Sequence, residues 1–296
     1  MALLAKDIAV SGILTKSNLP VADYSVNPYV GCAHGCKYCY ASFMKRFSNH
    51  PEPWGKFVDV KHWPEIKNPA RYAGKELFLG SVTDPYQPLE KTHRRTRALL
   101  EQMQGSGCTI SIATKSDLVV RDLDLIRTFP GARVSRSINT LDENFRAQMD
   151  CAASIERRIA AIKVFHDAGV RTTCFISPIF PGITDPKEII RRTKNQCNLV
   201  WLENLNLRGA YKSVIMQWIR MKENPAAAAV YGASRSRTRA ERDAPADAIA
   251  AKISAGTKRM GMVTDHGVER IAAVFAALKT GAAYASGSRR YPGFCG

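Results

Sequence analysis

Short apolar runs alternate with amphipathic stretches along the chain between Tyr29 and Leu205. The apolar runs are rich in Val, Ile, Phe and Leu, and several are almost continuously apolar, as in parallel strands that are covered on both faces. They predict six strands, at Tyr29–Gly31, Glu76–Ser81, Thr109–Thr114, Arg133–Ile138, Thr172–Ile176 and Leu199–Leu205.

Helical patterns separate these strands. The clearest runs from Ile155 to Ala168, with apolar residues at spacings of three and four and with Gly169 as its stop. Two more are expected at Leu89–Gln104 and Leu118–Phe129. Strands that alternate with helices form parallel βα units, so we expect an α/β fold, a partial (β/α)6 TIM-type barrel. Its chemistry would gather at the loops that follow the strands.

The pattern changes after Leu205. Helices are expected at Tyr211–Lys222, Ala246–Arg259 and Val268–Lys279, and arginines recur between the first two. The fold class therefore includes a helical, basic C-terminal extension. The expected domains are an N-terminal segment (1–25), a barrel core (26–210) and this extension (211–296).

Composition excludes a disordered chain, because 45% of the 296 residues are hydrophobic. The chain carries 43 Lys plus Arg and 26 Asp plus Glu, a formal net charge of +17. This excess favours polyanions such as DNA or RNA as partners. No signal peptide and no long uncharged apolar stretch is recognised, so a cytoplasmic location without membrane association is expected.

Three of the eight cysteines, Cys32, Cys36 and Cys39, fall within eight residues. Three thiolates on one loop can bind a single inorganic centre and leave a coordination position open for a substrate or cofactor. Gly31 and Gly35 allow tight turns around it. A structural zinc site is the alternative, but it needs a fourth ligand, and no second cysteine pair follows at the usual spacing.

The spacing C-x3-C-x2-C, with Tyr38 before the last cysteine, resembles the radical S-adenosylmethionine (radical SAM) superfamily. The resemblance implies that Cys32, Cys36 and Cys39 bind a [4Fe–4S] cluster whose fourth iron binds S-adenosylmethionine. It implies reductive cleavage of that cofactor to a 5′-deoxyadenosyl radical, which abstracts hydrogen from a substrate. It also implies that Tyr38 lies near the adenine.

Further motifs are similar to those of spore photoproduct lyase-like radical enzymes. The run ELFLGSVTDPYQPLE contains Thr83 and Asp84 after a strand, Lys115 follows the next strand, and Ser137 ends the one after. The resemblance implies that these residues hold the cofactor, with Lys115 at its carboxylate and Ser137 at its ribose. Alternatively, Asp84 serves a plain turn and Lys115 faces solvent. Over Val26–Arg208 the chain looks most similar to radical SAM mobile pair protein B.

The resemblance implies a lyase-like enzyme related to DNA repair, an electron donor such as flavodoxin or ferredoxin, and a paired radical SAM protein as a partner. The substrate is open between DNA or RNA, a peptide and a small molecule. An iron–sulfur module that binds nucleic acid without turnover is a further alternative, as is a zinc-bound domain. No catalytic residue is assigned, and the candidate thiol hydrogen donors are Cys108, Cys151, Cys174, Cys197 and Cys295.

Overall fold

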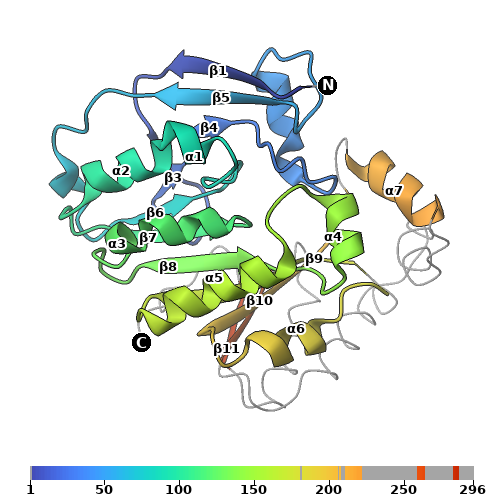
Figure 1. Cartoon of the computed structure of the whole chain (residues 1–296). Helices are drawn as coiled ribbons and strands as arrows, with labels where there is room; N and C mark the ends of the chain where they lie inside the picture. The colour runs from blue at the N-terminus through green and yellow to red at the C-terminus, as the bar shows by residue number, and fades with distance from the viewer. Residues whose placement is uncertain are drawn as a thin grey trace.

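The structure is a computed structural model that describes residues 2–180, 182–205, 207, 211–221, 259–263 and 283–286. Most of the described residues form one curved sheet with helices on one face, shown in Figure 1. None of the described helices has the length and apolar character needed to cross a membrane.

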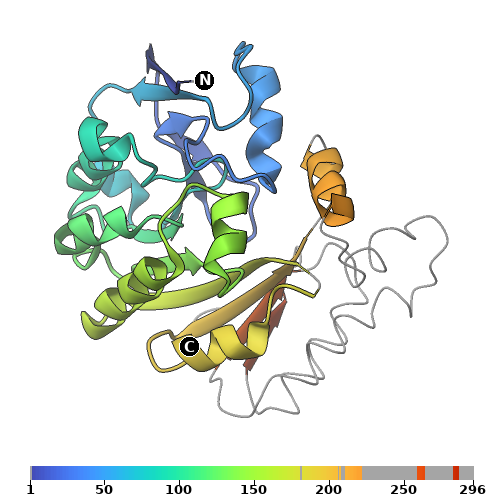
Figure 2. The same ribbon diagram turned by 45° about the vertical axis from the view of Figure 1, so that its right-hand side comes forward.

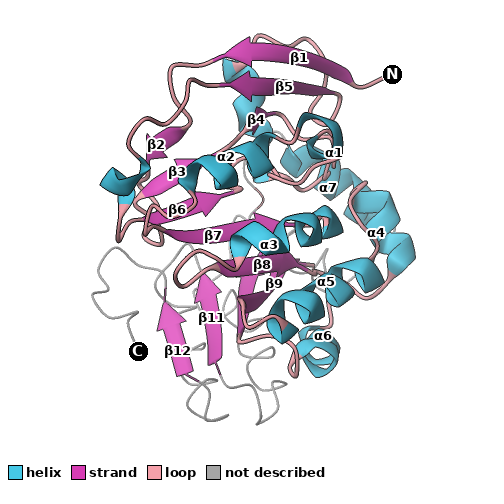
Figure 3. Cartoon of the chain, turned by 60° about the vertical axis from the view of Figure 1, so that its left-hand side comes forward, coloured by secondary structure: helices cyan, strands magenta, loops and turns pink. Residues whose placement is uncertain are grey.

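The main sheet has nine strands, and all neighbouring pairs are parallel except the pair of β2 and β3 (Figure 3). Parallel neighbours place the carboxyl ends of the strands at one edge, where the loops after β6, β7 and β8 meet. The fold is thus an α/β partial TIM-type barrel, as expected. In spatial order the strands are β12 (Ala283–Ser286), β11 (Arg259–Val263), β10 (Leu199–Asn204), β9 (Arg171–Ile179), β8 (Arg133–Ser137), β7 (Thr109–Thr114), β6 (Glu76–Leu79), β3 (Tyr24–Val26) and β2 (Leu14–Lys16).

Side chains alternate between the two faces of this sheet. In β7, Ile110 and Ile112 are buried in the apolar core together with residues of the helices, whereas Ser111 and Ala113 between them are partly exposed. A strand must alternate in this way when helices cover only one face. The covering helices are α1 (Glu90–His93), α2 (Arg95–Met103), α3 (Leu123–Ile126), α4 (Glu143–Met149), α5 (Ile155–Asp167) and α6 (Pro186–Thr193).

A second, smaller sheet lies at the N-terminal side of the barrel (Figure 2). It consists of β1 (Leu4–Ala9), β5 (Phe57–His62) and β4 (Tyr29–Val30), in that spatial order. The chain leaves β4 directly into the cysteine-rich segment and then forms the 3-10 helix η1 (Tyr40–Phe47). The small sheet therefore supports the segment that carries the three clustered cysteines.

Five of the six expected strands are confirmed in the main sheet as β6 to β10. The sixth forms as β4, but it lies in the small sheet, and β3 takes the first barrel position instead. The single helix expected at Leu89–Gln104 is divided into α1 and α2, because Arg94 has a left-handed φ of 50°. The helix expected at Leu118–Phe129 begins as the 3-10 helix η3 (Asp117–Asp122) and continues as α3. A further 3-10 turn, η2, spans Pro69–Tyr72.

The C-terminal part contributes one described helix and two strands. Helix α7 (Tyr211–Met221) matches the expected Tyr211–Lys222. The expected helix Ala246–Arg259 lies outside the described residues except for Arg259, which begins β11, and Val268–Lys279 lies outside them entirely. Strands β11 and β12 were not expected, and they extend the barrel sheet beyond β10. The division into 1–25, 26–210 and 211–296 stays a prediction.

Candidate functional site

The three clustered cysteines lie between β4 and η1, in a segment that we call the cysteine loop (residues 31–39). The loop turns tightly, since the amide of Gly35 donates to the carbonyl of Cys32 at 3.1 Å. Gly31 has a φ of +83°, and a Cβ atom there would lie 2.4 Å from the carbonyl oxygen of Phe57. Any side chain at this position would clash with β5, so the loop requires glycine to approach the small sheet.

Cys32 is buried, and Cys36 and Cys39 are partly buried. Burial, followed by the negative charge of Asp84, raises the pKa of Cys32 to about 12. Burial also raises the pKa of Cys36 and Cys39. A metal replaces such thiol protons when it binds, so neutral thiols held together on one loop fit a metal cluster.

No three His, Cys, Asp or Glu side chains among the described residues could hold one metal ion between them. A four-iron cluster does not need such a set, because each thiolate binds a different iron. The arrangement of the cysteine loop therefore fits a cluster whose three ligands come from separate turns of one loop.

A second loop, which follows β6 and which we call the β6 loop (residues 80–89), holds the cysteine loop in place. The Thr83 hydroxyl donates to the carbonyl of Gly31 at 2.6 Å. The Gln87 side-chain oxygen accepts from the amide of Ala33 at 2.8 Å, and Gln87 is fully buried. The Thr83 hydroxyl thus fixes the cysteine loop, and its expected contact with the cofactor stays a prediction. Sequence reasoning assigned no role to Gln87.

Further bonds join the β6 loop to both ends of the cysteine loop. Before it, the Asn27 side chain donates to the Ser81 hydroxyl at 2.8 Å and accepts from the amide of Val82 at 3.1 Å. After it, the Tyr40 hydroxyl donates to the carbonyl of Ser81. The β6 loop is thus attached to the first part of the cysteine loop and to the residues on either side of that loop.

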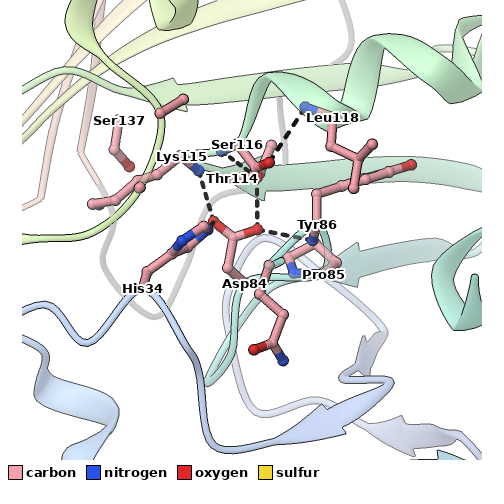
Figure 4. Close-up of polar contacts among 12 residues, drawn as sticks. His34, Asp84, Pro85, Tyr86, Thr114, Lys115, Ser116, Leu118 and Ser137 are labelled. Atoms are coloured by element: carbon pink, nitrogen blue, oxygen red, sulfur yellow. Dashed lines mark hydrogen bonds and ion pairs between the residues drawn. The ribbon is translucent and has the colours of Figure 1, made fainter. Parts of the chain in front are cut away.

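Asp84 of the β6 loop connects three segments, as Figure 4 shows. Its carboxylate accepts from the Thr114 hydroxyl at 2.6 Å and from the amide of Lys115 at 2.7 Å, both at the end of β7. It also accepts from the amide of Tyr86 at 2.9 Å. Nε2 of His34, on the cysteine loop, lies 3.2 Å from it, at an ion-pair distance but without hydrogen-bond geometry.

These contacts determine the charge of Asp84. Burial alone would raise its pKa, but the His34 ring, the Lys115 amide and the Thr114 hydroxyl hold the pKa well below its usual value. Asp84 is therefore ionised at neutral pH. Its carboxylate joins the cysteine loop, the β6 loop and the end of β7, and its expected role in holding the cofactor stays a prediction.

The opposite side of the cysteine loop is held by Asp150, just after α4. Asp150 accepts from the Tyr38 hydroxyl at 2.8 Å and from the Arg158 guanidinium at 2.6 Å. Two backbone bonds run beside this contact, from Lys37 to Met149 at 2.9 Å and from Cys151 to His34 at 2.8 Å. Tyr38 thus anchors the loop through its hydroxyl, and its expected place near an adenine stays a prediction.

An apolar cluster covers this side of the loop. It joins the Tyr38 ring to Phe145 of α4, to Phe180 and to Ile215 of α7, and Cys36 packs against it. Helix α7, which follows β10 in the chain and is orange in Figure 2, therefore packs against Tyr38 of the cysteine loop. Water is excluded from this side of the thiols.

The open face of the sheet presents mixed polar and aromatic groups at one level beside the cysteine loop. Ser137 of β8 pairs in register with Phe175 of β9, which pairs with Trp201 of β10. The Lys115 ammonium lies 5.7 Å from the centre of the Tyr38 ring, next to Ser137 in Figure 4. The indole N–H of Trp201 is buried and has no hydrogen-bond partner. The expected cofactor contacts of Lys115 and Ser137 stay predictions, and Trp201 is an additional donor two strands away from Ser137.

The other described cysteines differ in exposure. Cys108 and Cys174 are buried, Cys197 is partly exposed and Cys151 is exposed. Burial raises the pKa of Cys174 to about 12, so its thiol is neutral. Cys295, the remaining candidate hydrogen donor, lies outside the described residues.

The chain is similar to known proteins both in sequence and in structure. The sequence profile of the radical SAM superfamily matches residues 26–192. An uncharacterized protein of Methanocaldococcus jannaschii is 37% identical over 199 residues, which cover 67% of this chain and 76% of that protein. A radical SAM Nalpha-GlyT isomerase of Pseudomonas phage M6 is 24% identical over 166 residues, and the match covers 55% of this chain and 34% of the isomerase.

Solved structures of spore photoproduct lyase share the fold. One variant of the lyase superposes with a TM-score of 0.56 and 14% identity, over 95% of this chain and 81% of the lyase. Another structure, with bound AdoMet and dinucleoside spore photoproduct, gives a TM-score of 0.51 and 16% identity, over 77% of this chain and 68% of the lyase. At such low identity the likeness concerns the fold alone.

Proposed function

Because the chain belongs to the radical SAM superfamily, whose enzymes use a [4Fe–4S] cluster and S-adenosylmethionine, we propose that it cleaves this cofactor reductively at a cluster bound by Cys32, Cys36 and Cys39. The observation that carries the proposal is the position of three buried or partly buried thiols on one loop that protein contacts hold from both sides. The bound group would supply one electron to the cofactor's sulfonium, which yields methionine and a 5′-deoxyadenosyl radical that removes hydrogen from the substrate.

The protein's own contribution is to hold the reacting groups in place. The β6 loop fixes the backbone of the cysteine loop through Thr83 and Gln87, and Asp150 fixes it from the other side through Tyr38. Rigid support of this kind keeps the ligands in position while an electron is transferred. Helix α7 and its apolar cluster exclude water on one side.

The open face of the sheet suits the organic cofactor. Lys115 offers a cation for its carboxylate, Ser137 a hydroxyl for its ribose and Trp201 an unpaired donor. A buried donor without a partner costs free energy, so a ligand that satisfies it is favoured. We therefore assign cofactor contacts to Lys115 and Ser137, and we assign indirect roles through the loops to Thr83 and Asp84.

Nucleic acid is the substrate class that we propose. The net charge of +17 favours a polyanion. A structural neighbour, spore photoproduct lyase, has been solved with a dinucleoside photoproduct bound.

We also propose that a flavodoxin or a ferredoxin supplies the electron to the cluster. The proposed location is the cytoplasm, because such donors are reduced there. A second, paired radical SAM protein is the further partner that we propose, because the chain resembles mobile pair protein B.

The test is anaerobic reconstitution of the full chain, followed by iron and sulfide analysis and by mass spectrometry of the cofactor products. We expect iron and sulfide at a four-iron ratio and release of 5′-deoxyadenosine when dithionite is added. Cys36→Ala should lose both signals. Cys151→Ala, which removes an exposed thiol beside the loop, is the matched control and should keep them.

Other outcomes would overturn parts of the proposal. Zinc without iron or sulfide would favour a structural metal domain. A cluster and DNA binding without any 5′-deoxyadenosine would indicate a binding module without turnover. If peptides stimulate 5′-deoxyadenosine release and DNA or RNA oligonucleotides do not, the nucleic-acid assignment is wrong and a peptide substrate replaces it.

A further inference from the structure

Helix η1, which begins directly after the cysteine loop, exposes aromatic side chains to solvent. Tyr40, Phe43 and Phe47 are 59%, 41% and 67% exposed. Among the described residues no other Phe, Tyr or Trp side chain is as exposed as these three. An aromatic surface of this kind on a globular protein marks a binding site more often than chance exposure.

Positive charge accompanies these rings. The Arg46 guanidinium lies 4.9 Å from the centre of the Phe47 ring and 5.5 Å from that of Phe43. Lys37 and Lys45 are nearby in the chain, and no Asp or Glu occurs between Tyr24 and Pro51. The surface is therefore both aromatic and cationic, and nothing in this stretch of chain neutralises it.

The position of η1 links this surface to the proposed chemistry. Tyr40 follows Cys39 directly, and its hydroxyl donates to the β6 loop at Ser81. In Figure 2, η1 stands at the edge of the molecule, clear of the main sheet. A chain bound along η1 would therefore extend toward the cysteine loop at one of its ends.

We propose that the surface of Tyr40, Phe43, Arg46 and Phe47, here called the η1 surface, binds single-stranded nucleic acid by stacking its bases and pairing its phosphates. The proposal deepens the nucleic-acid assignment above and rests on it for its biological meaning. Unpaired bases stack on aromatic rings regardless of sequence, and arginine supplies both a phosphate contact and a further stacking plane. A base pair within a duplex does not offer these faces, so the proposed occupant is a single strand.

The test is binding of a fluorescein-labelled single-stranded DNA oligonucleotide to the anaerobically reconstituted full chain, measured by anisotropy over a range of salt concentrations. Phe47→Ala should weaken binding about 5- to 150-fold, which is the range for loss of one stacking side chain. Phe47→Trp should restore it. Arg46→Ser should also weaken binding and should reduce the slope of log affinity against log salt by about 0.7, as for one lost phosphate contact.

Matched controls lie on the far helices. Val164→Ala removes another exposed apolar side chain, 37% exposed, and Arg191→Ser removes another exposed cation. Both should bind the oligonucleotide as the unmodified chain does. Release of 5′-deoxyadenosine without a substrate should be unchanged in Phe47→Ala, because η1 holds neither a cluster ligand nor a proposed cofactor contact.

Two binding results would overturn the inference. The first is an affinity of Phe47→Ala for the oligonucleotide that is within twofold of the unmodified chain's. The second is an equal loss of affinity in Phe47→Ala and in Val164→Ala. If Phe47→Ala loses binding to anionic phosphatidylserine vesicles but not to the oligonucleotide, the surface binds lipid. If it only changes the oligomeric state, the surface binds a second copy of the chain. A chain that releases no 5′-deoxyadenosine but loses strand binding in Phe47→Ala would overturn the proposed function and leave this inference standing.

Discussion

The cysteine loop and η1 are consecutive in the chain, yet they are built in opposite ways. The loop is enclosed: Thr83 and Gln87 bind it from one side, and Asp150 binds it from the other. Helix η1 has one buried residue, Ala41, and exposes its aromatic rings to solvent. The change from enclosed to exposed chain occurs between Cys39, the last expected cluster ligand, and Tyr40, the first exposed aromatic residue.

The difference separates two requirements that conflict. Ligands for a redox cluster need fixed positions, and buried polar contacts fix them because each partner is costly to leave unpaired. A binding surface must remain accessible and so contributes little to folding. Substitutions in the cysteine loop and its contacts should therefore change stability and iron loading, and substitutions in η1 should change strand binding.

Removal of the Asp150 carboxylate is expected to have the largest effect. Asp150→Ala should lower the free energy of unfolding by about 3–5 kcal/mol, because Arg158 would be left buried without its counter-charge. Urea unfolding of the cofactor-free protein measures this. Asp167→Ala, which breaks an exposed pair with Lys163, is the control and should leave the urea midpoint unchanged. Equal effects of the two substitutions would mean that the enclosure of the loop does not depend on Asp150.

Gln87→Ala should have the next largest effect. It leaves the amide of Ala33 without its side-chain acceptor and so should cost about 1–3 kcal/mol of stability. It should also reduce the iron bound per chain after reconstitution, because the cysteine loop loses one attachment. Gln104→Ala is the control, since Gln104 is an exposed residue just after α2. A Gln87→Ala protein that is less stable but binds iron fully would show that the contact serves folding only.

Protonation of Asp150 should lower the free energy of unfolding by less than its removal does, since protonation neutralises the carboxylate without removing it. Burial alone would raise its pKa, but Arg158, Lys115 and the Tyr38 hydroxyl lower it below the usual value. A carboxylate with a lowered folded pKa stabilises the protein above its unfolded pKa of about 3.9, and this stabilisation is lost as the pH falls toward the folded value.

The comparison with Asp150→Asn tests this charge. The difference in unfolding free energy between the two proteins should be constant from about pH 8 to about pH 5 and should shrink below about pH 4. Urea unfolding of the cofactor-free proteins at each pH gives the two curves. A difference that grows on acidification would contradict the assignment of Asp150 as the anion in this network.

The two segments were also unequally predictable from sequence. Strands β6 to β10 could be predicted because Val, Ile and Leu mark a buried strand locally, and the cysteine spacing identified the loop. The partners of Thr83 and Gln87 could not be predicted, because their contacts join residues about fifty positions apart, and nothing local shows which loops meet. The break at Arg94 was missed because arginine rarely adopts a positive φ.

Strands β11 and β12 show a second limit. Their short segments carry Gly and Ala among the apolar residues; β11 lies between two stretches with helical patterns, and β12 follows the second of them. Only pairing with β10 makes β11 a strand, and β11 in turn pairs with β12. Long-range pairing overrides weak local preference in such cases. The exposure of η1 could not be predicted from sequence for a related reason, because the burial of a side chain depends on which distant segments pack against it.

The smallest expected change in stability is that of Phe47→Ala, and it sharpens the comparison most. Because this side chain is 67% exposed, its loss should change the free energy of unfolding by less than about 0.5 kcal/mol and should leave the iron content unchanged. The same substitution should weaken strand binding at least about fivefold, whereas Gln87→Ala should do the reverse and impair iron loading more than binding. Urea unfolding, iron analysis and anisotropy on the same two preparations give all six values. If Phe47→Ala lowers iron content as Gln87→Ala does, η1 and the cysteine loop form one structural unit, and the separation at Cys39 and Tyr40 is wrong.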